Sequence, residues 1–136
     1  MKIGLIGAGA WGTAFALHLA RTGKEVLLWV FEKELFDIAK KTKENSYYLP
    51  GFVLPDNIAF TDDIKSIPEF SGNIIFAPPS FALRKTAAMI SEELSDKRVL
   101  ILSKGIENGT NLFMSEVIKE IIPGRARIAS LSGPSF

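Results

Sequence analysis

The sequence predicts an α/β fold, in which a doubly wound, mostly parallel β-sheet carries helices on both faces. Apolar, strand-like segments alternate along the chain with segments of helical periodicity. Several of the strand-like segments, including residues 3–6, 74–76 and 99–102, are apolar almost throughout, which is typical of strands buried on both faces. The 136 residues are enough for one such domain with a hydrophobic core, but not for two.

Each predicted element has a local signal. The predicted strands are Lys2–Ile6, Glu25–Val30, Ile58–Thr61, Asn73–Ala77, Arg98–Ser103 and Ala126–Leu131, and the predicted helices are Ala10–Arg21, Glu32–Lys43, Ser80–Ser95 and Leu112–Ile122. Thr22 and Gly23 are a typical helix end, and Ser80 is predicted as an N-cap. Residues 45–57 contain two prolines and one glycine and are predicted as a loop.

Composition excludes several classes of function. The chain has no cysteine and one histidine, so we expect no disulfide, no metal site built on these ligands and no Ser-His-Asp triad. The net charge of +1 gives no basic face for nucleic acid, and the apolar runs have the length of strands, so we expect no membrane insertion. Chemistry carried by a bound organic cofactor remains open.

A glycine-rich turn between the first strand and the first helix is the strongest signal for function. It consists of Gly7, Ala8, Gly9, Ala10, Trp11 and Gly12. A Gly-x-Gly-x-x-Gly pattern in this context is typical of Rossmann-type dinucleotide-binding domains. The first glycine permits the tight turn, the second lets a pyrophosphate approach the backbone, and the third lets the helix pack closely. A plain tight turn is the weaker alternative.

Glu32 is the predicted ribose-binding acid, because it lies 20 residues after Gly12, just past the second strand. The alternative is a glutamate favoured by the positive end of the next helix. In either case its carboxylate would repel a 2′-phosphate, and no basic residue stands at positions 30–32, although Lys33 follows. The sequence therefore favours NAD over NADP.

Two further segments follow predicted strands and so lie at the carboxyl edge, where open α/β sheets bind ligands. Lys104, in Ser-Lys-Gly-Ile-Glu at 103–107, could place a positive charge on a carbonyl or phosphate oxygen; a solvated surface lysine is the alternative. Gly133 and Ser135, in Leu-Ser-Gly-Pro-Ser at 131–135, could hold an anionic substrate, although by position alone an ordinary turn is favoured. Tyr48 either stacks near a cofactor or covers the core.

Taken together, these motifs resemble the N-terminal domain of NAD-dependent glycerol-3-phosphate dehydrogenase over residues 2–136. The matching pieces are Gly-Ala-Gly-Ala-Trp-Gly-Thr at 7–13, Leu-Trp-Val-Phe-Glu at 28–32, Asn45 with Tyr-Leu-Pro-Gly at 48–51, Leu-Pro at 54–55 with Asn57, Pro79 with Arg84, Ser-Lys-Gly-Ile-Glu at 103–107, Ser-Glu at 115–116, and Leu-Ser-Gly-Pro-Ser at 131–135. Each piece alone is modest evidence, whereas the ordered set is specific.

The resemblance implies reversible hydride transfer between NADH and dihydroxyacetone phosphate, which gives sn-glycerol 3-phosphate. It implies cofactor contacts at residues 7–12 and at Phe31, a place for Lys104 beside nicotinamide and substrate, and substrate contacts at Gly133 and Ser135. Bacterial members commonly carry basic residues after the second strand. This chain instead has Phe31-Glu32, which is similar to the NAD-linked eukaryotic branch.

The family's helical C-terminal domain, which supplies the general-acid/base lysine, is absent from this chain. We therefore expect residues 1–136 to be the NAD-binding domain, to continue beyond Phe136 in the natural protein, and to show negligible turnover alone. The resemblance implies a cytoplasmic enzyme and leaves a homodimer open for the full-length protein. Alternatives are another Rossmann dehydrogenase acting on a hydroxyacid, a non-catalytic NAD-sensing module and, more weakly, a flavoprotein.

Overall fold

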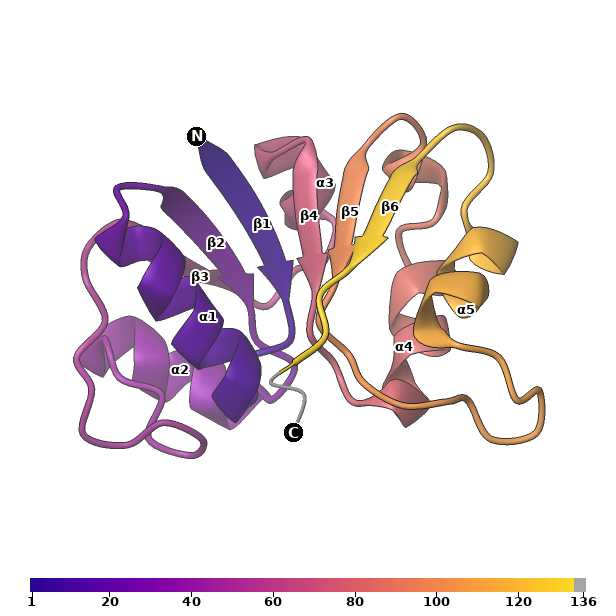
Figure 1. The fold of residues 1–136 in the computed structure, drawn as a ribbon. Helices are drawn as coiled ribbons and strands as arrows, with labels where there is room; N and C mark the ends of the chain where they lie inside the picture. The colour runs from indigo at the N-terminus through magenta and orange to yellow at the C-terminus, as the bar shows by residue number, and fades with distance from the viewer. Residues whose placement is uncertain (134–136) are drawn as a thin grey trace.

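Six parallel strands form one sheet in the computed structural model, which describes residues 1–133 (Figure 1). The strands are β1 (Lys2–Ile6), β2 (Glu25–Trp29), β3 (Ile58–Thr61), β4 (Asn73–Phe76), β5 (Arg98–Ile101) and β6 (Arg127–Ser130). Their order in the sheet is β3-β2-β1-β4-β5-β6, so the order reverses between β1 and β4. This is the doubly wound Rossmann topology, and ligands of such sheets bind at the carboxyl edge near the reversal.

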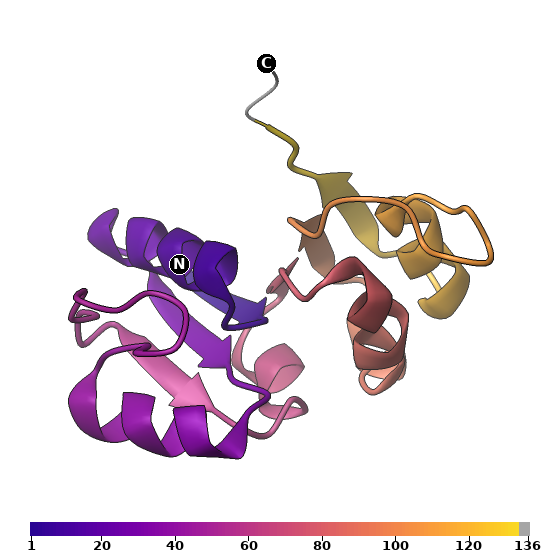
Figure 2. The same ribbon diagram turned by 90° about the horizontal axis from the view of Figure 1, so that it is seen from below.

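The connecting helices are α1 (Ala10–Arg21), α2 (Lys33–Thr42), α3 (Ser66–Phe70), α4 (Ser80–Ala88), the 3₁₀ turn η1 (Glu92–Leu94) and α5 (Met114–Ile121). Seen from the carboxyl edge, β1–β3 with α1 and α2 form one half of the molecule, and β4–β6 with α4 and α5 form the other (Figure 2). Among residues 1–133, no helix is long and apolar enough to cross a membrane.

Two apolar layers hold the helices on the sheet. On one face α1 and α2 bury residues such as Leu17 and Leu35 against Leu5 and Leu28. On the other face α3, α4 and α5 pack against the opposite sides of the strands, around the fully buried Phe76. The predicted burial of the central strands on both faces is thus confirmed.

Most predicted boundaries agree with the structure within two residues, but three details of the prediction were wrong. The predicted helix 80–95 ends at Ala88 and is followed by the separate turn η1. Its N-cap is Pro79, and Ser80 is the first helical residue. The short helix α3 was not predicted at all; it packs on β1, where a Cβ on Gly4 would lie 2.6 Å from Cγ2 of Ile67.

Candidate functional site

The glycines of the turn between β1 and α1 meet different surroundings. Gly7 has φ +112°, and a Cβ on it would lie 2.7 Å from the carbonyl carbon of Ala77. A Cβ on Gly12 would overlap the carbonyl oxygen of Gly7, so Gly12 lets α1 approach the turn. A Cβ on Gly9 would meet no atom within 4 Å. Two of these glycines are therefore required by packing, whereas Gly9 faces open space.

The first turn of α1 is open to an anion. Gly9 is its N-cap, and within the described chain no side chain caps this end and no acidic residue lies in the first turn. Backbone N–H groups and the positive end of the helix dipole therefore point into the space beside Gly9. An uncapped helix N-terminus behind a glycine turn fits a pyrophosphate group.

A buried asparagine fixes this turn to the loop 45–57. Asn45 is 2% exposed, and its amide nitrogen donates to the carbonyl oxygen of Ala8 and to Oγ1 of Thr13, each at 2.7 Å. Its side-chain oxygen accepts from the backbone N–H of Tyr48 at 3.1 Å. Both polar atoms of its side chain are thus used, and the position of Tyr48 depends on the glycine turn. From the sequence, Asn45 was noticed only as part of the family resemblance.

Glu32, Phe31 and Tyr48 lie together at the end of β2. Glu32 is the N-cap of α2, and its Oε1 accepts a hydrogen bond of 2.6 Å from the hydroxyl of Tyr48. This bond, reinforced by the negative charge of Glu32, raises the pKa of Tyr48 above its ordinary value. Phe31 is 77% exposed, with its ring 5.9 Å from that of Trp29. The three residues form a surface with a carboxylate, a phenol and an apolar ring.

Lys33 is the basic residue nearest to Glu32 in sequence, but its ammonium group is paired. Its Nζ lies 3.0 Å from Oδ1 of Asp37 and 3.4 Å from Oδ2 of Asp62. The hydrogen bond to Asp37 is the main cause that raises the pKa of Lys33. These carboxylates compete with any phosphate group for this cation.

Lys104 lies where three segments from distant parts of the sequence meet. Its Nζ donates to the carbonyl oxygen of Gly133 at 2.7 Å and lies 5.6 Å from the centre of the Trp11 ring. An ammonium group at this distance from an indole ring is attracted to it. The structure thus brings Lys104, Gly133 and Trp11 together at the carboxyl edge of the sheet. Ser135 lies outside the described residues.

Arg84, in contrast, is bound by carboxylates. Its guanidinium group donates to both carboxylate oxygens of Glu107 and to Oε2 of Glu120, at distances of 2.8–3.2 Å. The sequence offered no signal for this pairing, because the partners are 23 and 36 residues away from Arg84.

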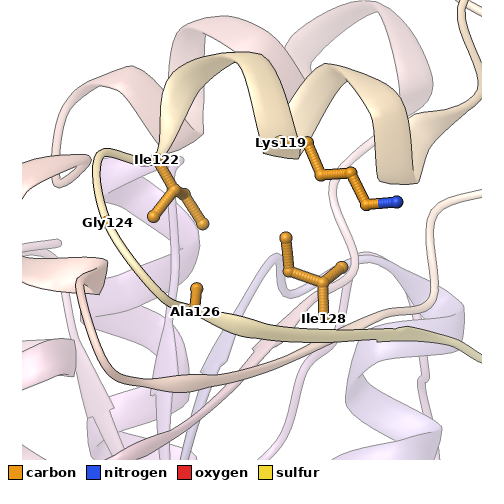
Figure 3. A pocket seen from close by; sticks show the side chains of 5 residues that line it. All are labelled: Lys119, Ile122, Gly124, Ala126 and Ile128. Atoms are coloured by element: carbon orange, nitrogen blue, oxygen red, sulfur yellow. The ribbon is translucent and has the colours of Figure 1, made fainter.

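A hollow lies between α5 and β6, and none of the residues described above lines it (Figure 3). It is lined by Lys119, Ile122, Gly124, Ala126 and Ile128. None of these lining residues is a predicted site residue. The candidate site is therefore the carboxyl edge from the glycine turn to Lys104.

Comparison with known proteins identifies the family. Residues 2–136 match the family model of the NAD-dependent glycerol-3-phosphate dehydrogenase N-terminus. The chain belongs to this family. A glycerol-3-phosphate dehydrogenase (NAD(P)+) of Syntrophotalea carbinolica is 38% identical over 139 residues, which cover 100% of this chain and 42% of that protein.

Two solved structures of dehydrogenases have a similar fold. A crystal structure of glycerol-3-phosphate dehydrogenase from Coxiella burnetii superposes with a TM-score of 0.90 at 33% identity, covering 99% of this chain and 41% of that one. A ternary structure of D-mandelate dehydrogenase with NADH and anilino(oxo)acetate has a TM-score of 0.70 at 25% identity, covering 96% of this chain and 40% of that one. The chain thus spans about two fifths of the length of the relatives it matches.

Proposed function

We propose that residues 1–136 are the cofactor-binding N-terminal domain of an oxidoreductase that interconverts sn-glycerol 3-phosphate and dihydroxyacetone phosphate with NAD(H). The observation that carries the proposal is the open, uncapped start of α1 beside Gly9, in a chain of the glycerol-3-phosphate dehydrogenase family. Relatives are named as enzymes that use NAD(P)+, and this chain corresponds to about two fifths of their length.

The cofactor would lie along the carboxyl edge. The N–H groups at the start of α1 would bind its pyrophosphate, with Ala8, Ala10 and Trp11 beside it. Glu32 would accept hydrogen bonds from the adenosine ribose, and Phe31 would cover the adenosine. When bound, the cofactor supplies or accepts the hydride.

Substrate binding is assigned to the other end of this edge. The ammonium group of Lys104 would exchange the Gly133 carbonyl or the Trp11 face for the substrate oxygen and stabilise negative charge that develops on it. Gly133 and Ser135 would contact the substrate, as the family resemblance implies. A helical C-terminal domain would supply the general-acid/base lysine and most of the phosphate site, so residues 1–136 alone should not catalyse the reaction.

We propose NAD rather than NADP as the cofactor. A 2′-phosphate would lie next to the carboxylate of Glu32, and two like charges at about 4 Å repel by about 1 kcal/mol in water and by more near a protein surface. Tyr48 holds that carboxylate in place, and Lys33, the adjacent cation, is shared by two aspartates. The cytoplasmic location of the protein and a homodimer of the full-length chain stay predictions.

A second candidate, a dehydrogenase of a hydroxyacid, is favoured by the structural similarity to D-mandelate dehydrogenase. Oxidation of NADH by the full-length protein, with dihydroxyacetone phosphate or with a panel of 2-oxo acids, separates the two. We expect turnover with the phosphate ester alone. Turnover with a 2-oxo acid alone would support the second candidate, and cofactor binding without turnover on either would favour an NAD sensor.

The same assay tests Lys104. Replacement of Lys104 by alanine should lower turnover by orders of magnitude, whereas Lys85→Ala, an exposed lysine on α4, should leave it unchanged. Near-normal turnover of the Lys104→Ala protein would identify Lys104 as an ordinary surface lysine.

A further inference from the structure

The segment 103–113, here called the Lys104 loop, joins β5 to α5 and is closed on itself. The N–H of Glu107 donates to the carbonyl oxygen of Leu112 at 2.9 Å, and Ile106 and Phe113 form an isolated antiparallel bridge. At its start, the hydroxyl of Ser103 donates to the carbonyl oxygen of Pro78. The loop therefore has internal order and is held at both ends, because the N–H of its last residue, Phe113, donates to Oε2 of Glu116 on α5 at 2.8 Å. None of these contacts, however, ties Glu107 to α4.

A second anchor joins Glu107 to α4. From α4, Arg84 grips the carboxylate of Glu107 with two nitrogens: Nε is 2.9 Å from Oε2, and Nη2 is 2.9 Å from Oε1. The hydroxyl of Thr110 donates to the same carboxylate at 2.7 Å. The Glu107 side chain is only 14% exposed, and its hydrogen bonds to Arg84 and then Thr110 hold its pKa below the ordinary value.

This arrangement differs from an ordinary surface ion pair. Two parallel N–H···O bonds fix the relative orientation of two planar groups, whereas a single exposed pair does not. Lys104 lies between the two anchors, one residue after Ser103 and three before Glu107. Both anchors tie the Lys104 loop to the region of α4, because Pro78 lies just before this helix and Arg84 lies on it.

We propose that Arg84 and Glu107 are positioning residues for Lys104: their paired contact fixes the Lys104 loop, so that the ammonium group stays beside the cofactor site. The inference rests on the role proposed for Lys104 above. Two carboxylates, those of Glu107 and Glu120, already occupy the guanidinium group of Arg84. Displacement of a catalytic group by about 1 Å can lower a rate about 100-fold.

The contact of Arg84 with Glu120 supplies a matched control. Glu120 lies on α5, is 53% exposed and bonds to Arg84 at 2.8 Å, and within residues 1–133 it makes no hydrogen bond or ion pair with the Lys104 loop. If the cluster only tied α4 to α5, loss of either carboxylate would have similar effects. If it positions Lys104, only loss of Glu107 should reduce turnover.

The test compares Glu107→Gln, Arg84→Lys and Glu120→Gln in the full-length protein. We expect Glu107→Gln to lower kcat by about 10- to 100-fold, with the Kd for NADH within about twofold of wild type, because the glycine turn is untouched. Arg84→Lys keeps the positive charge but loses the bidentate hydrogen bond to Glu107, so its kcat should fall less than that of Glu107→Gln. Glu120→Gln should stay within about twofold of wild type.

Wild-type kcat in both Glu107→Gln and Arg84→Lys would overturn the inference, as would an equal loss in Glu120→Gln. Arg84→Lys also keeps the test valid if Glu107→Gln does not fold. Failure of the proposed function would look different, because the wild-type protein would then not oxidise NADH with dihydroxyacetone phosphate. In that case, faster amide hydrogen exchange at residues 104–112 in Glu107→Gln than in Glu120→Gln would support the anchor, and equal exchange would overturn it.

Discussion

Replacement of Gly9 by alanine should weaken cofactor binding without unfolding the protein. The backbone of Gly9 has φ −71° and ψ −177°, which alanine adopts without strain, and the added methyl group would meet no atom. Alanine at such a position gains about 0.4–1 kcal/mol from the unfolded chain, which roughly offsets the loss of glycine as an N-cap. We therefore expect the free energy of unfolding to change by less than about 1 kcal/mol.

The methyl group would occupy the space through which a pyrophosphate reaches the backbone. A hydrogen bond to a charged group contributes about 1.5–3 kcal/mol, so loss of one should raise the Kd for NADH by about 10- to 150-fold. The assay is calorimetric titration of NADH into the wild-type and Gly9→Ala forms of the full-length protein. Wild-type affinity in a folded Gly9→Ala protein would refute the assignment of this turn to the pyrophosphate.

Gly12→Ala is the matched control, because it should destabilise the fold, whereas Gly9→Ala should not. Its methyl group would overlap the carbonyl oxygen of Gly7 and lie 3.2 Å from Cβ of Ala77. Overpacking of this kind costs about 1–3 kcal/mol, and because the contact is with backbone, we expect the cost to exceed the gain in helix propensity of about 1 kcal/mol. Thermal unfolding followed by circular dichroism should show a lowered Tm, and an unchanged Tm would contradict the close packing of α1.

Four further outcomes are expected. Glu32→Ser should raise the affinity for NADPH relative to NADH at least about tenfold in titrations, and an unchanged ratio would remove Glu32 from cofactor selection. Asn45→Ala leaves the buried carbonyl of Ala8 unpaired and should lower the free energy of unfolding by about 1–3 kcal/mol in a denaturant titration. An unchanged free energy of unfolding would contradict a stabilising role for the hydrogen bond between Asn45 and Ala8. Because Arg84 lowers the pKa of Glu107, their pairing stabilises the fold above about pH 4.3 and is lost as the pH falls through the lowered value. The wild-type protein should therefore lose more stability on acidification than Glu107→Gln, and parallel Tm curves against pH would contradict this. Finally, residues 1–136 alone should show no NADH oxidation with dihydroxyacetone phosphate, and measurable turnover would refute the need for a second domain.

The sequence was sufficient for the elements that carry strong local signals. β1 and α1 have the predicted bounds, because an apolar run, a glycine turn and a Thr-Gly end each mark a boundary directly. The helix predicted over residues 80–95 failed for a physical reason. Leu83, Ala87, Ile90 and Leu94 are all buried at helical spacing, and this spacing continues through the change from α4 to η1. Apolar periodicity reports which face is buried, but not where the backbone hydrogen bonds change.

In the candidate site, the sequence indicated which groups matter, but not how they are held. The glycine turn and Glu32 follow from spacing along the chain, and Lys104 follows from its place after a buried strand. The ties that position them join residues far apart: Asn45 to Ala8 over 37 residues, and Glu107 to Arg84 over 23. No local pattern encodes such pairs, because they depend on which strands become neighbours.

The location of the cofactor is the central claim, and amide chemical shifts measured during an NADH titration test it most directly. We expect the shifts to concentrate at residues 9–13, 31–32, 48 and 104, along the carboxyl edge. The amides of residues 119–128, around the hollow between α5 and β6, should not move. Shifts confined to residues 119–128, with none at the glycine turn, would contradict it.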